Sequence, residues 1–576
     1  MAGSADFIQR MVHTLEAGGL AVWVRRALAL AVVLGIALFY LLHEFRGLAT
    51  SQAMDQAQIG RNIAAGQGWR TDIVRPLAVG QLQAHDKNVA QRIWFDTYHA
   101  PLPPLVDAVA LRVIKSKWKM TPRDVIYLGD RVIAFTSICL FLAALVVCYF
   151  TARRLFDARL ALLATSLVLL CDMMWQYSLS GLPQMLLLFL FNCAMYALVR
   201  TVQAQDDGGR VGVWLAAVGG CFGLLALSHA LTIWIFIPLL ICSVFMFRPR
   251  GRAALIVLVA FSALYLPWLA RNYVISGNPG GVAIYSVLDG INRSEAGHMR
   301  RLQPDLKDVG PGHFRNKIMG NIISQADSMF RYLGWSIVAS VFFVGLLYAY
   351  RRHDTAIIRW IVLAMWSGAF LGMAAYGITE EQGVASNQLH LLFVPMMTCY
   401  GLAFLLVQWN RLEIESRLAR IAFLTLLFLL CSWPMVNNFF APRKARVQWP
   451  PYVPPYISVL NDWMKPEELI ASDMPWAISW YADRRSLYLP ETVKAMTDFH
   501  DYGLAGAPVN GLYLTPISGS QNKLADVLKG EYKDWAGVIL RSVDLQKFPL
   551  PWATLLGLEN ECIFFSDHDR QKVPTP

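Results

Sequence analysis

Apolar residues in this chain run in long blocks rather than in short alternating patterns. A block of about 20 apolar residues can cross a hydrocarbon core of ~30 Å as one helix. The blocks predict about eleven transmembrane helices, so the expected fold class is a polytopic α-helical membrane protein. The expected spans lie near residues 27–45, 125–150, 158–175, 181–199, 211–227, 231–247, 253–272, 333–350, 356–376, 388–407 and 419–437.

Basic residues orient these spans, because lysine and arginine concentrate in cytoplasmic loops. One set of loops carries Arg25, Arg26, Arg153, Arg154, Arg159, Arg200, Arg210, Arg248, Arg250, Arg252, Arg351, Arg352, Arg359, Arg411, Arg417 and Arg420. The opposite short loops, near Gln176, near His229 and over 377–387, contain neither lysine nor arginine. This alternation predicts a cytoplasmic N-terminus in a multi-pass inner-membrane protein.

Two long loops, 46–124 and 273–332, and the tail then fall on the outer face. We expect a transmembrane module over 1–437 and a periplasmic or extracytoplasmic α/β domain over 438–576. Four prolines predict a stiff linker before that domain: Pro450, Pro451, Pro454 and Pro455. Within it, the predicted strands are 469–472, 486–489, 511–515 and 537–540, and the predicted helices are 491–502 and 521–529.

Each of the two outer loops contains a candidate amphipathic helix. In 51–65, Ala53, Ala57, Ile59 and Ile63 share an apolar side. In the second loop, Phe314, Ile318 and Ile322 recur at intervals of four residues. Both segments are expected to form helices that could lie in the membrane interface.

Composition agrees with a bilayer environment: 56% of the residues are hydrophobic, 16% are charged, and the mean hydropathy is +0.41. The net charge of +11 does not indicate nucleic acid, because the basic residues sit beside the spans. The segment before Arg25 lacks a cleavage-site pattern, so the first span is expected to remain as an uncleaved anchor.

Cysteine spacing supports neither a disulfide framework nor a structural metal site. Eight of the nine cysteines lie within or beside apolar blocks, where cysteine acts as a small hydrophobe. The ninth, Cys562, lies in the tail.

The ionisable residues near the spans gather at their ends, and the middles are almost free of them. Those at outer ends are Asp130, Arg131, Asp172, His229, Arg271 and His390. A transporter that couples ions to substrate usually places such groups near the membrane midplane. The pattern therefore favours chemistry on a lipid head group over passage of a solute.

Three motifs and the outer tail resemble the C-type membrane glycosyltransferases, in the branch of protein O-mannosyltransferases and lipid A aminoarabinose transferases. Residues 54–69 read MDQAQIGRNIAAGQGW and resemble the family's acidic juxtamembrane helix with its Gly-rich turn. Residues 98–105 read YHAPLPPL, similar to a Lys/His-Pro-Pro-Leu segment. Residues 266–273 read LPWLARNY, followed by GNP, similar to a Pro-Trp-x-x-Arg-Asn run. The resemblance covers about 440 residues loosely.

The resemblance implies inverting transfer of a sugar from a polyprenyl-phosphate donor to a lipid, glycan or protein acceptor outside the membrane. It implies Asp55 as the base that takes the acceptor's proton, and His99 and Arg271 as ligands of the donor phosphate. Asp172 and His390 are possible secondary site residues. No metal or other cofactor is required by this mechanism, although metal dependence stays open.

Each of these residues also has a purely structural interpretation. Asp55 could simply favour the N-terminal turn of a helix capped by Ser51, and Arg271 could be a snorkelling anchor. His99 could bond the backbone beside the prolines. Asp172 could be a polar helix end, and Glu380 with Glu381 a solvated loop. His229 and His390 could be packed or capping histidines.

The chain departs from the family pattern in two motifs. Protein mannosyltransferases carry an adjacent acidic pair, but here Gln56 follows Asp55. The lysine often found before Pro-Pro-Leu is replaced by His99, and Ala100 interrupts the segment. These changes weaken assignment to either branch.

The tail holds a cluster that could contact a sugar acceptor or could be an ordinary core: Asp473, Trp476, Trp480, Tyr481, Asp483 and Arg484. Two other functions compete with sugar transfer. One is a transporter or flippase of lipid-linked or polar solutes, and the other is a catalytically silent scaffold for an envelope assembly.

Overall fold

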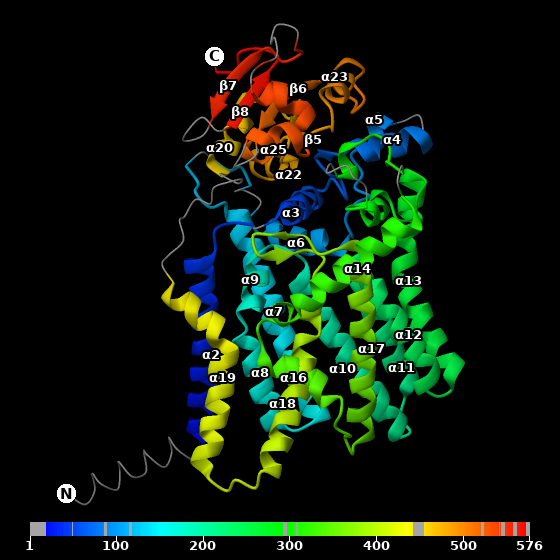
Figure 1. The fold of residues 1–576 in the computed structure, drawn as a ribbon, viewed down its shortest axis with the longest axis vertical. Helices are drawn as coiled ribbons and strands as arrows, with labels where there is room; N and C mark the ends of the chain where they lie inside the picture. Colours follow the sequence, from blue (N-terminus) through cyan, green and yellow to red (C-terminus); the bar gives the residue numbers. More distant parts are fainter. Residues whose placement is uncertain are drawn as a thin grey trace, which may run out of the picture.

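The computed structural model describes residues 19–48, 50–85, 89–114, 118–121, 123–291, 297–306, 309–441, 454–519, 524–540, 542, 548–556 and 562–571. A bundle of helices forms one half of the molecule, and a sheet domain lies over one end of it (Figure 1). Pro450 and Pro451 of the predicted linker lie outside the described residues. Pro454 and Pro455 begin the short helix α20.

A helix occurs at each of the eleven predicted spans. They are α2 (Gly19–Phe39), continued by η1 (Tyr40–Glu44), α7 (Leu128–Leu155), α8 (Ala158–Leu169), α10 (Gln184–Asp206), α11 (Val211–Ala226), η3 (Ala230–Thr232) with α12 (Ile233–Met246), α13 (Arg250–Ser276), α16 (Ile337–Gly345), α17 (His353–Tyr376), α18 (Val394–Arg411) and α19 (Arg417–Phe440).

Their lengths do not confirm eleven crossings. Among the described residues, six helices are long and apolar enough to span a membrane, and a seventh span is possible if α8 and α9 (Asp172–Leu179), bent by 55°, count as one. α16 has nine residues, and at 1.5 Å per residue it is too short to cross alone. An apolar block thus locates a helix without setting its length.

The arginine-rich loops lie together at the end of the bundle away from the sheet domain (Figure 1). Arg352 donates to the carbonyl oxygen of Arg154 at 3.1 Å. His353 lies 3.2 Å from Asp206, and the Gln205 side chain accepts from the backbone N–H of Arg248 at 3.0 Å. The predicted grouping of these loops on one side is therefore present in the fold.

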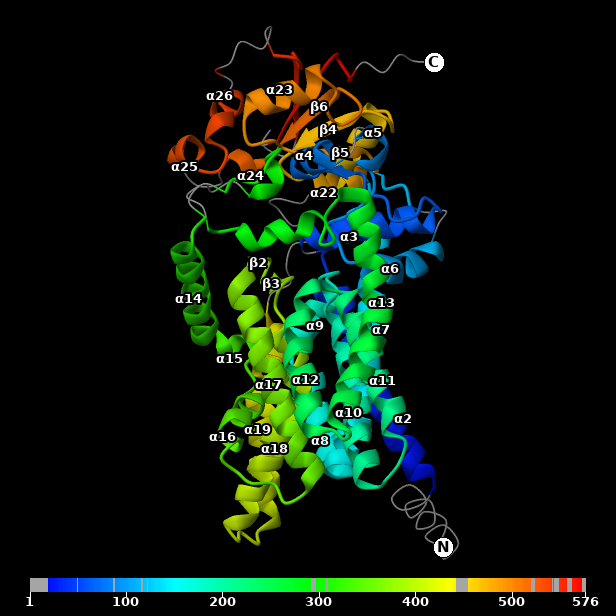
Figure 2. The ribbon, with the colours of Figure 1, turned by 90° about the vertical axis from the view of Figure 1, so that its right-hand side faces the viewer.

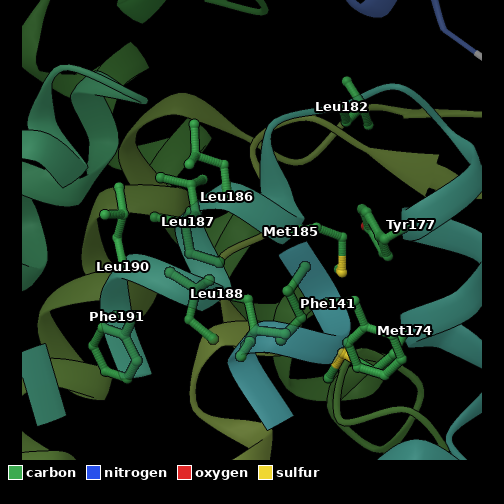
Figure 3. Close-up of a cluster of buried hydrophobic side chains, with 14 of the residues drawn as sticks. Phe141, Met174, Tyr177, Leu182, Met185, Leu186, Leu187, Leu188, Leu190 and Phe191 are labelled. Carbon is green, nitrogen blue, oxygen red and sulfur yellow. The ribbon is translucent and has the colours of Figure 1, made fainter. Parts of the chain in front are cut away.

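The core of the bundle lies where α7, α9 and α10 meet (Figure 3). Phe141, Met174, Met185 and Phe191 are buried there among leucines of α10. α10 is apolar on every side, which is typical of a helix surrounded by other helices. The outer helices α2 and α19 pack against each other through Phe39 and Phe439, with ring centroids 4.0 Å apart.

A layer of short helices separates the bundle from the sheet domain (Figures 1 and 2). It comprises α3 (Ser51–Ala64), α6 (Leu102–Arg112), η4 (Val282–Leu288) and η5 (His298–Arg300). The helices α4 (Pro76–His85) and α5 (Val89–Arg92) lie beside the sheet domain, and α14 (Pro311–Asp327) and α15 (Met329–Tyr332) lie alongside the bundle, where α14 packs against α17. The predicted helix at 51–65 is confirmed, but Ala53, Ala57 and Ile59 are fully buried. The helix therefore lies inside the protein, between α6 and the sheet domain, and not in the membrane interface.

The sheet domain is built on a six-stranded sheet with the order β1-β5-β4-β6-β8-β7. Its strands are β1 (Ile73–Val74), β4 (Leu469–Ser472), β5 (Arg485–Tyr488), β6 (Val509–Leu514), β7 (Trp552–Leu556) and β8 (Cys562–Ser566). β1, β5, β4 and β6 are parallel, and β8 and β7 continue antiparallel. The other elements of the domain are α20 (Pro454–Ser458), α21 (Leu460–Trp463), α22 (Pro475–Ala477), η7 (Ile478–Ala482), α23 (Val493–Asp501), α24 (Pro516–Gly519), α25 (Leu524–Lys529), η8 (Lys533–Trp535) and α26 (Ala536–Ile539).

The sheet differs from the sequence prediction in two ways. The predicted strand at 537–540 is largely the helix α26, and β7 and β8 were not predicted. In addition, β1 comes from the long loop predicted at 46–124 and pairs with β5. The loop and the tail therefore share one sheet, and this shared sheet brings the two halves of the candidate site together.

Candidate active site

Asp55 lies on the first helix after the first span. Thr50 caps this helix, α3, by accepting a hydrogen bond from the backbone N–H of Ala53 at 3.2 Å. Gly60 lets α3 approach α6 closely, since a Cβ added there would lie 3.0 Å from the carbonyl oxygen of Pro104. The cap and this contact fix the helix that presents Asp55.

The Asp55 carboxylate is buried, with 2% of the residue exposed, and it contacts two basic side chains. Arg75 Nη2 forms an ion pair with Oδ2, and His99 Nε2 lies 2.9 Å from the same oxygen. Gln58 donates to Oδ1 at 3.3 Å. The structure thus brings together Asp55 and His99, two of the residues predicted from sequence.

Burial by itself raises the pKa of Asp55, but the charges of Arg75 and His99 and the hydrogen bonds lower it more. The net pKa lies well below its usual range, so the carboxylate is ionised at neutral pH. An ionised carboxylate is the form that can accept a proton.

Asp96 connects this pair to Arg271. Its side chain lies 3.6 Å from Arg75 Nη1 and accepts from the backbone N–H of His99 at 2.8 Å. Its carbonyl oxygen accepts from Arg271 Nη1 at 2.7 Å. The Arg271 guanidinium also lies 4.3 Å above the Trp268 ring. Arg271 is therefore linked to the Asp55 cluster through Asp96.

A cavity of about 130 Å³ opens beside Asp55. Its walls come from four separate parts of the chain: the start of α3, the loop before α6, the hairpin between α17 and α18, and β5. The lining residues are Thr50, Ser51, Gln52, Asp55, Tyr98, Thr379, Glu381, Val384, Ser386 and Tyr488. Hydroxyl, amide and carboxylate groups dominate this wall, which suits a polar ligand.

The hairpin of β2 (Glu380–Glu381) and β3 (Val384–Ala385) closes one side of the cavity. Glu381 accepts hydrogen bonds from the backbone N–H and the hydroxyl of Ser51, both at 2.7 Å. Glu380 pairs with Arg331. The two glutamates therefore make specific contacts and do not form a simple solvated loop.

Asp172 and His390 lie apart from the Asp55 cluster and make other contacts. Asp172 accepts hydrogen bonds from Tyr40, from Gln176 at 2.6 Å and from Asn438 at 2.8 Å. His390 contacts the Trp366 indole N–H at 3.1 Å and Gln325 at 3.2 Å. His229 accepts from the backbone N–H of Leu231 at 3.3 Å and caps η3.

Three of the six residues of the tail cluster, Trp480, Tyr481 and Asp483, lie at the seam between the sheet domain and the layer below it. Asp130 of α7 accepts from the Trp480 indole at 2.7 Å and from Tyr481 at 3.0 Å. Arg61 of α3 donates to the carbonyl oxygens of Ser479 and Trp480 and pairs with Asp483 at 2.7 Å. Trp480 and Tyr481 are buried. These residues hold the domain against α3.

Arg75, Asp96 and Tyr488 were not predicted from the sequence as site residues. Arg75 directly follows the apolar pair of β1, and Asp96 precedes His99 by three residues. Their positions beside an apolar pair and beside a candidate site residue are the features of the sequence that could have identified them. Tyr488 had no local signal, because only sheet pairing places it near Asp55. Among the described residues, no three His, Cys, Asp or Glu side chains group in a way that could hold a metal ion.

Asp107 is another buried carboxyl group in this layer. It lies on α6, and its Cβ would lie 2.9 Å from a Cβ added at Gly60. Burial raises its pKa to about 7. The folded protein therefore holds this proton more tightly than the unfolded chain, and stability falls as pH rises from about 4 to about 7.

We expect Asp107→Asn to remove this fall. The variant should melt at a higher temperature than the wild type at pH 8, and the gain should shrink to nothing near pH 4. Thermal unfolding in detergent across this pH range measures the difference. A gain that is constant with pH would show that Asp107 does not titrate in this range.

No family model and no curated protein sequence matches the chain. Its fold matches that of solved structures. The oligosaccharyltransferase AglB of Archaeoglobus fulgidus, in complex with an inhibitory peptide and a dolichol-phosphate, aligns with a TM-score of 0.52 and 12% identity, over 96% of this chain and 75% of that one. The same enzyme tethered to an acceptor peptide aligns with a TM-score of 0.51 and 13% identity, over 90% and 72%.

ArnT, the aminoarabinose transferase from Cupriavidus metallidurans, bound to undecaprenyl phosphate, aligns with a TM-score of 0.51 and 12% identity, over 97% of this chain and all of that one. AglB and ArnT are both C-type membrane glycosyltransferases. The chain therefore has the fold that the sequence resemblance implied. At this identity the likeness concerns the fold.

Proposed function

We propose that this protein transfers a sugar from a polyprenyl-phosphate donor to an envelope acceptor, a lipid, glycan or protein, with inversion at the anomeric carbon. The site lies at the end of the bundle that carries the sheet domain. In a cell this end would face the periplasm or exterior, and the N-terminus would lie in the cytoplasm of an inner-membrane protein.

One observation carries the proposal: an ionised carboxylate, Asp55, lines a polar cavity directly after the first span. A lipid-linked donor has its phosphate at the membrane surface and its sugar just beyond it. Asp55 lies on α3, which begins seven residues after the π-helix Tyr40–Glu44 that ends the first span. This position just past the first span supports placing Asp55 at the depth of a lipid head group.

In the proposed reaction, the acceptor hydroxyl oxygen attacks the anomeric carbon of the donor. The bond between that carbon and the phosphate oxygen breaks, and polyprenyl phosphate leaves with the bonding electron pair. Asp55 accepts the hydroxyl proton as the new glycosidic bond forms. A single displacement of this kind inverts the configuration at the anomeric carbon.

The leaving phosphate gains negative charge, so the site needs cations nearby. His99 touches Asp55, and Arg271 bonds to Asp96, which contacts His99. Both are proposed ligands of the donor phosphate. AglB and ArnT support a lipid-phosphate carrier as the donor, since their structures hold dolichol-phosphate and undecaprenyl phosphate respectively. Asp172 and His390 remain possible secondary site residues, and their hydrogen bonds are to residues outside the Asp55 cluster.

The assay uses the full-length protein in lipid nanodiscs with undecaprenyl phosphate carrying mannose, glucose or aminoarabinose. Release of undecaprenyl phosphate and formation of a glycosylated product are measured. We expect at least one donor to be consumed. Movement of lipid-linked sugar across proteoliposome membranes without release of lipid phosphate would overturn the proposal and support the transporter alternative.

Arg271→Met is expected to raise the KM for the donor by roughly 10- to 100-fold, since a charge-assisted hydrogen bond contributes about 1.5 to 3 kcal/mol. Steady-state kinetics with varied donor concentration measure this change. Arg70→Met is the matched control, because Arg70 lies in the same layer and stacks on Phe95 at 5.4 Å. Equal KM values in the two variants would contradict the role of Arg271.

A further inference from the structure

Tyr488 of the sheet domain lies beside the Asp55 cluster because of the pairing between β1 and β5. Ile73 lies opposite Ser486, and Val74 opposite Leu487. The next residues along the two parallel strands are Arg75 and Tyr488. The Arg75 guanidinium carbon lies 5.8 Å from the centre of the Tyr488 ring. The register of this strand pair thus places Arg75, the ion-pair partner of Asp55, next to Tyr488 of the tail.

Tyr98 flanks the same guanidinium from the first outer loop, at 4.5 Å. Tyr98 and Tyr488 are both half-buried, and both line the cavity with Asp55. The Tyr488 ring is held in place by Trp476, whose ring centroid lies 5.7 Å away. Within the described part of the chain, the Tyr488 hydroxyl makes no hydrogen bond to another residue, so it can bond to a ligand.

The two rings supply apolar surface in a cavity whose other lining residues are polar, apart from Val384. A sugar ring has the matching character, with C–H groups on its faces and hydroxyl groups at its edge, and aromatic side chains combine an apolar body with a polar tip. The cavity volume of about 130 Å³ is below the ~300 to 1,000 Å³ typical of sites that enclose a whole drug-sized ligand. It is suited to one small ring.

We propose that the C-terminal domain completes the sugar site, with Tyr488 and Tyr98 holding the transferred sugar ring next to Asp55. This inference rests on the proposed function and extends it in two respects. It names a single sugar unit as the occupant of the cavity, and it makes the outer domain part of the site. Tyr488 is then a positioning residue for the sugar, while the lipid phosphate binds elsewhere.

The test compares binding of two ligands to the full-length protein in nanodiscs. One is bare undecaprenyl phosphate, and the other is the same lipid phosphate carrying mannose, glucose or aminoarabinose. The ratio of the two dissociation constants reports the affinity that the sugar adds. For the wild type we expect at least one sugar to increase the affinity about tenfold over that of the bare lipid phosphate. Tyr488→Leu should bring this ratio close to one and leave binding of bare undecaprenyl phosphate unchanged.

Two further variants separate a sugar contact from loss of folding. Tyr488→Phe keeps the aromatic ring, so most of the affinity that the sugar adds should be retained. Trp552→Leu replaces an aromatic residue on β7, at the far edge of the same sheet, whose side chain is 51% exposed. It should not change either dissociation constant.

The inference is overturned if no sugar adds affinity in the wild type, if Tyr488→Leu keeps the wild-type ratio, or if it weakens both ligands equally. These results differ from failure of the proposed function. That failure would appear as sugar-dependent binding, lost in Tyr488→Leu, without any release of undecaprenyl phosphate.

Discussion

Replacing Asp55 with asparagine is expected to abolish sugar transfer, with kcat reduced by roughly 10²- to 10⁴-fold. Asparagine has nearly the same shape but cannot accept the acceptor's proton. Arg75 would remain near Asp96, at 3.6 Å, so the variant should fold. Release of polyprenyl phosphate measures the loss, and the thermal midpoint in detergent verifies folding.

Asp354→Asn is the matched control for this variant. Asp354 is also buried, with 6% of the residue exposed, and it accepts hydrogen bonds from Arg352 and Gln203. It lies at the start of α17, at the opposite end of the bundle from the cavity. We expect wild-type activity from it. Full activity in Asp55→Asn would remove Asp55 as the base.

Replacing Arg75 with methionine is expected to lower the free energy of unfolding by about 3 to 5 kcal/mol, because it leaves a buried carboxylate without its ion-pair partner. Asp55 would lose the strongest charge that lowers its pKa. Its pKa should therefore rise, and the acid limb of the pH–activity profile should move to higher pH. Unfolding by heat and the pH dependence of kcat/KM measure the two effects.

Two comparisons isolate the ion pair. Adding Asp55→Asn to Arg75→Met should restore part of the lost stability, because the uncompensated charge is then gone. Arg331→Met breaks an exposed pair with Glu380, whose side chains are 45% and 28% exposed, and should change stability by less than about 1 kcal/mol. Strictly additive losses in the double variant would show that the Asp55–Arg75 contact is energetically unimportant.

The helices of the bundle could be predicted from sequence because apolar side chains must cover the whole length of a helix in lipid. All eleven apolar blocks contain helices. The number of crossings could not be predicted in the same way. The block at 333–350 contains the nine-residue α16, and turns take up the rest of its length. Hydropathy alone does not distinguish these arrangements.

The motifs named Asp55 and His99 as site residues but could not predict their contact, since their separation in sequence says nothing about distance. The roles of Arg75 and Tyr488 depend on β1, a strand of two residues. Two residues are too few to show a strand pattern. Its partner β5 lies in the tail, far along the chain, so the pairing is a tertiary event that no local signal reports.

The errors in the sheet domain have a similar cause. The short apolar run at 537–540 resembles a buried strand, but most of it belongs to α26. β8 is buried at every position, so it lacks the alternation that marks a strand with one solvated face. Periodicity cannot distinguish a short buried strand from a buried helical turn.

The central claim is that Asp55 acts as a base in a single displacement at the anomeric carbon. The most direct test is the anomeric configuration of the product formed from a donor of known configuration, determined by nuclear magnetic resonance before the anomers equilibrate. The proposed mechanism predicts inversion. Retention would require a glycosyl-enzyme intermediate or a different catalytic group, and it would contradict this mechanism.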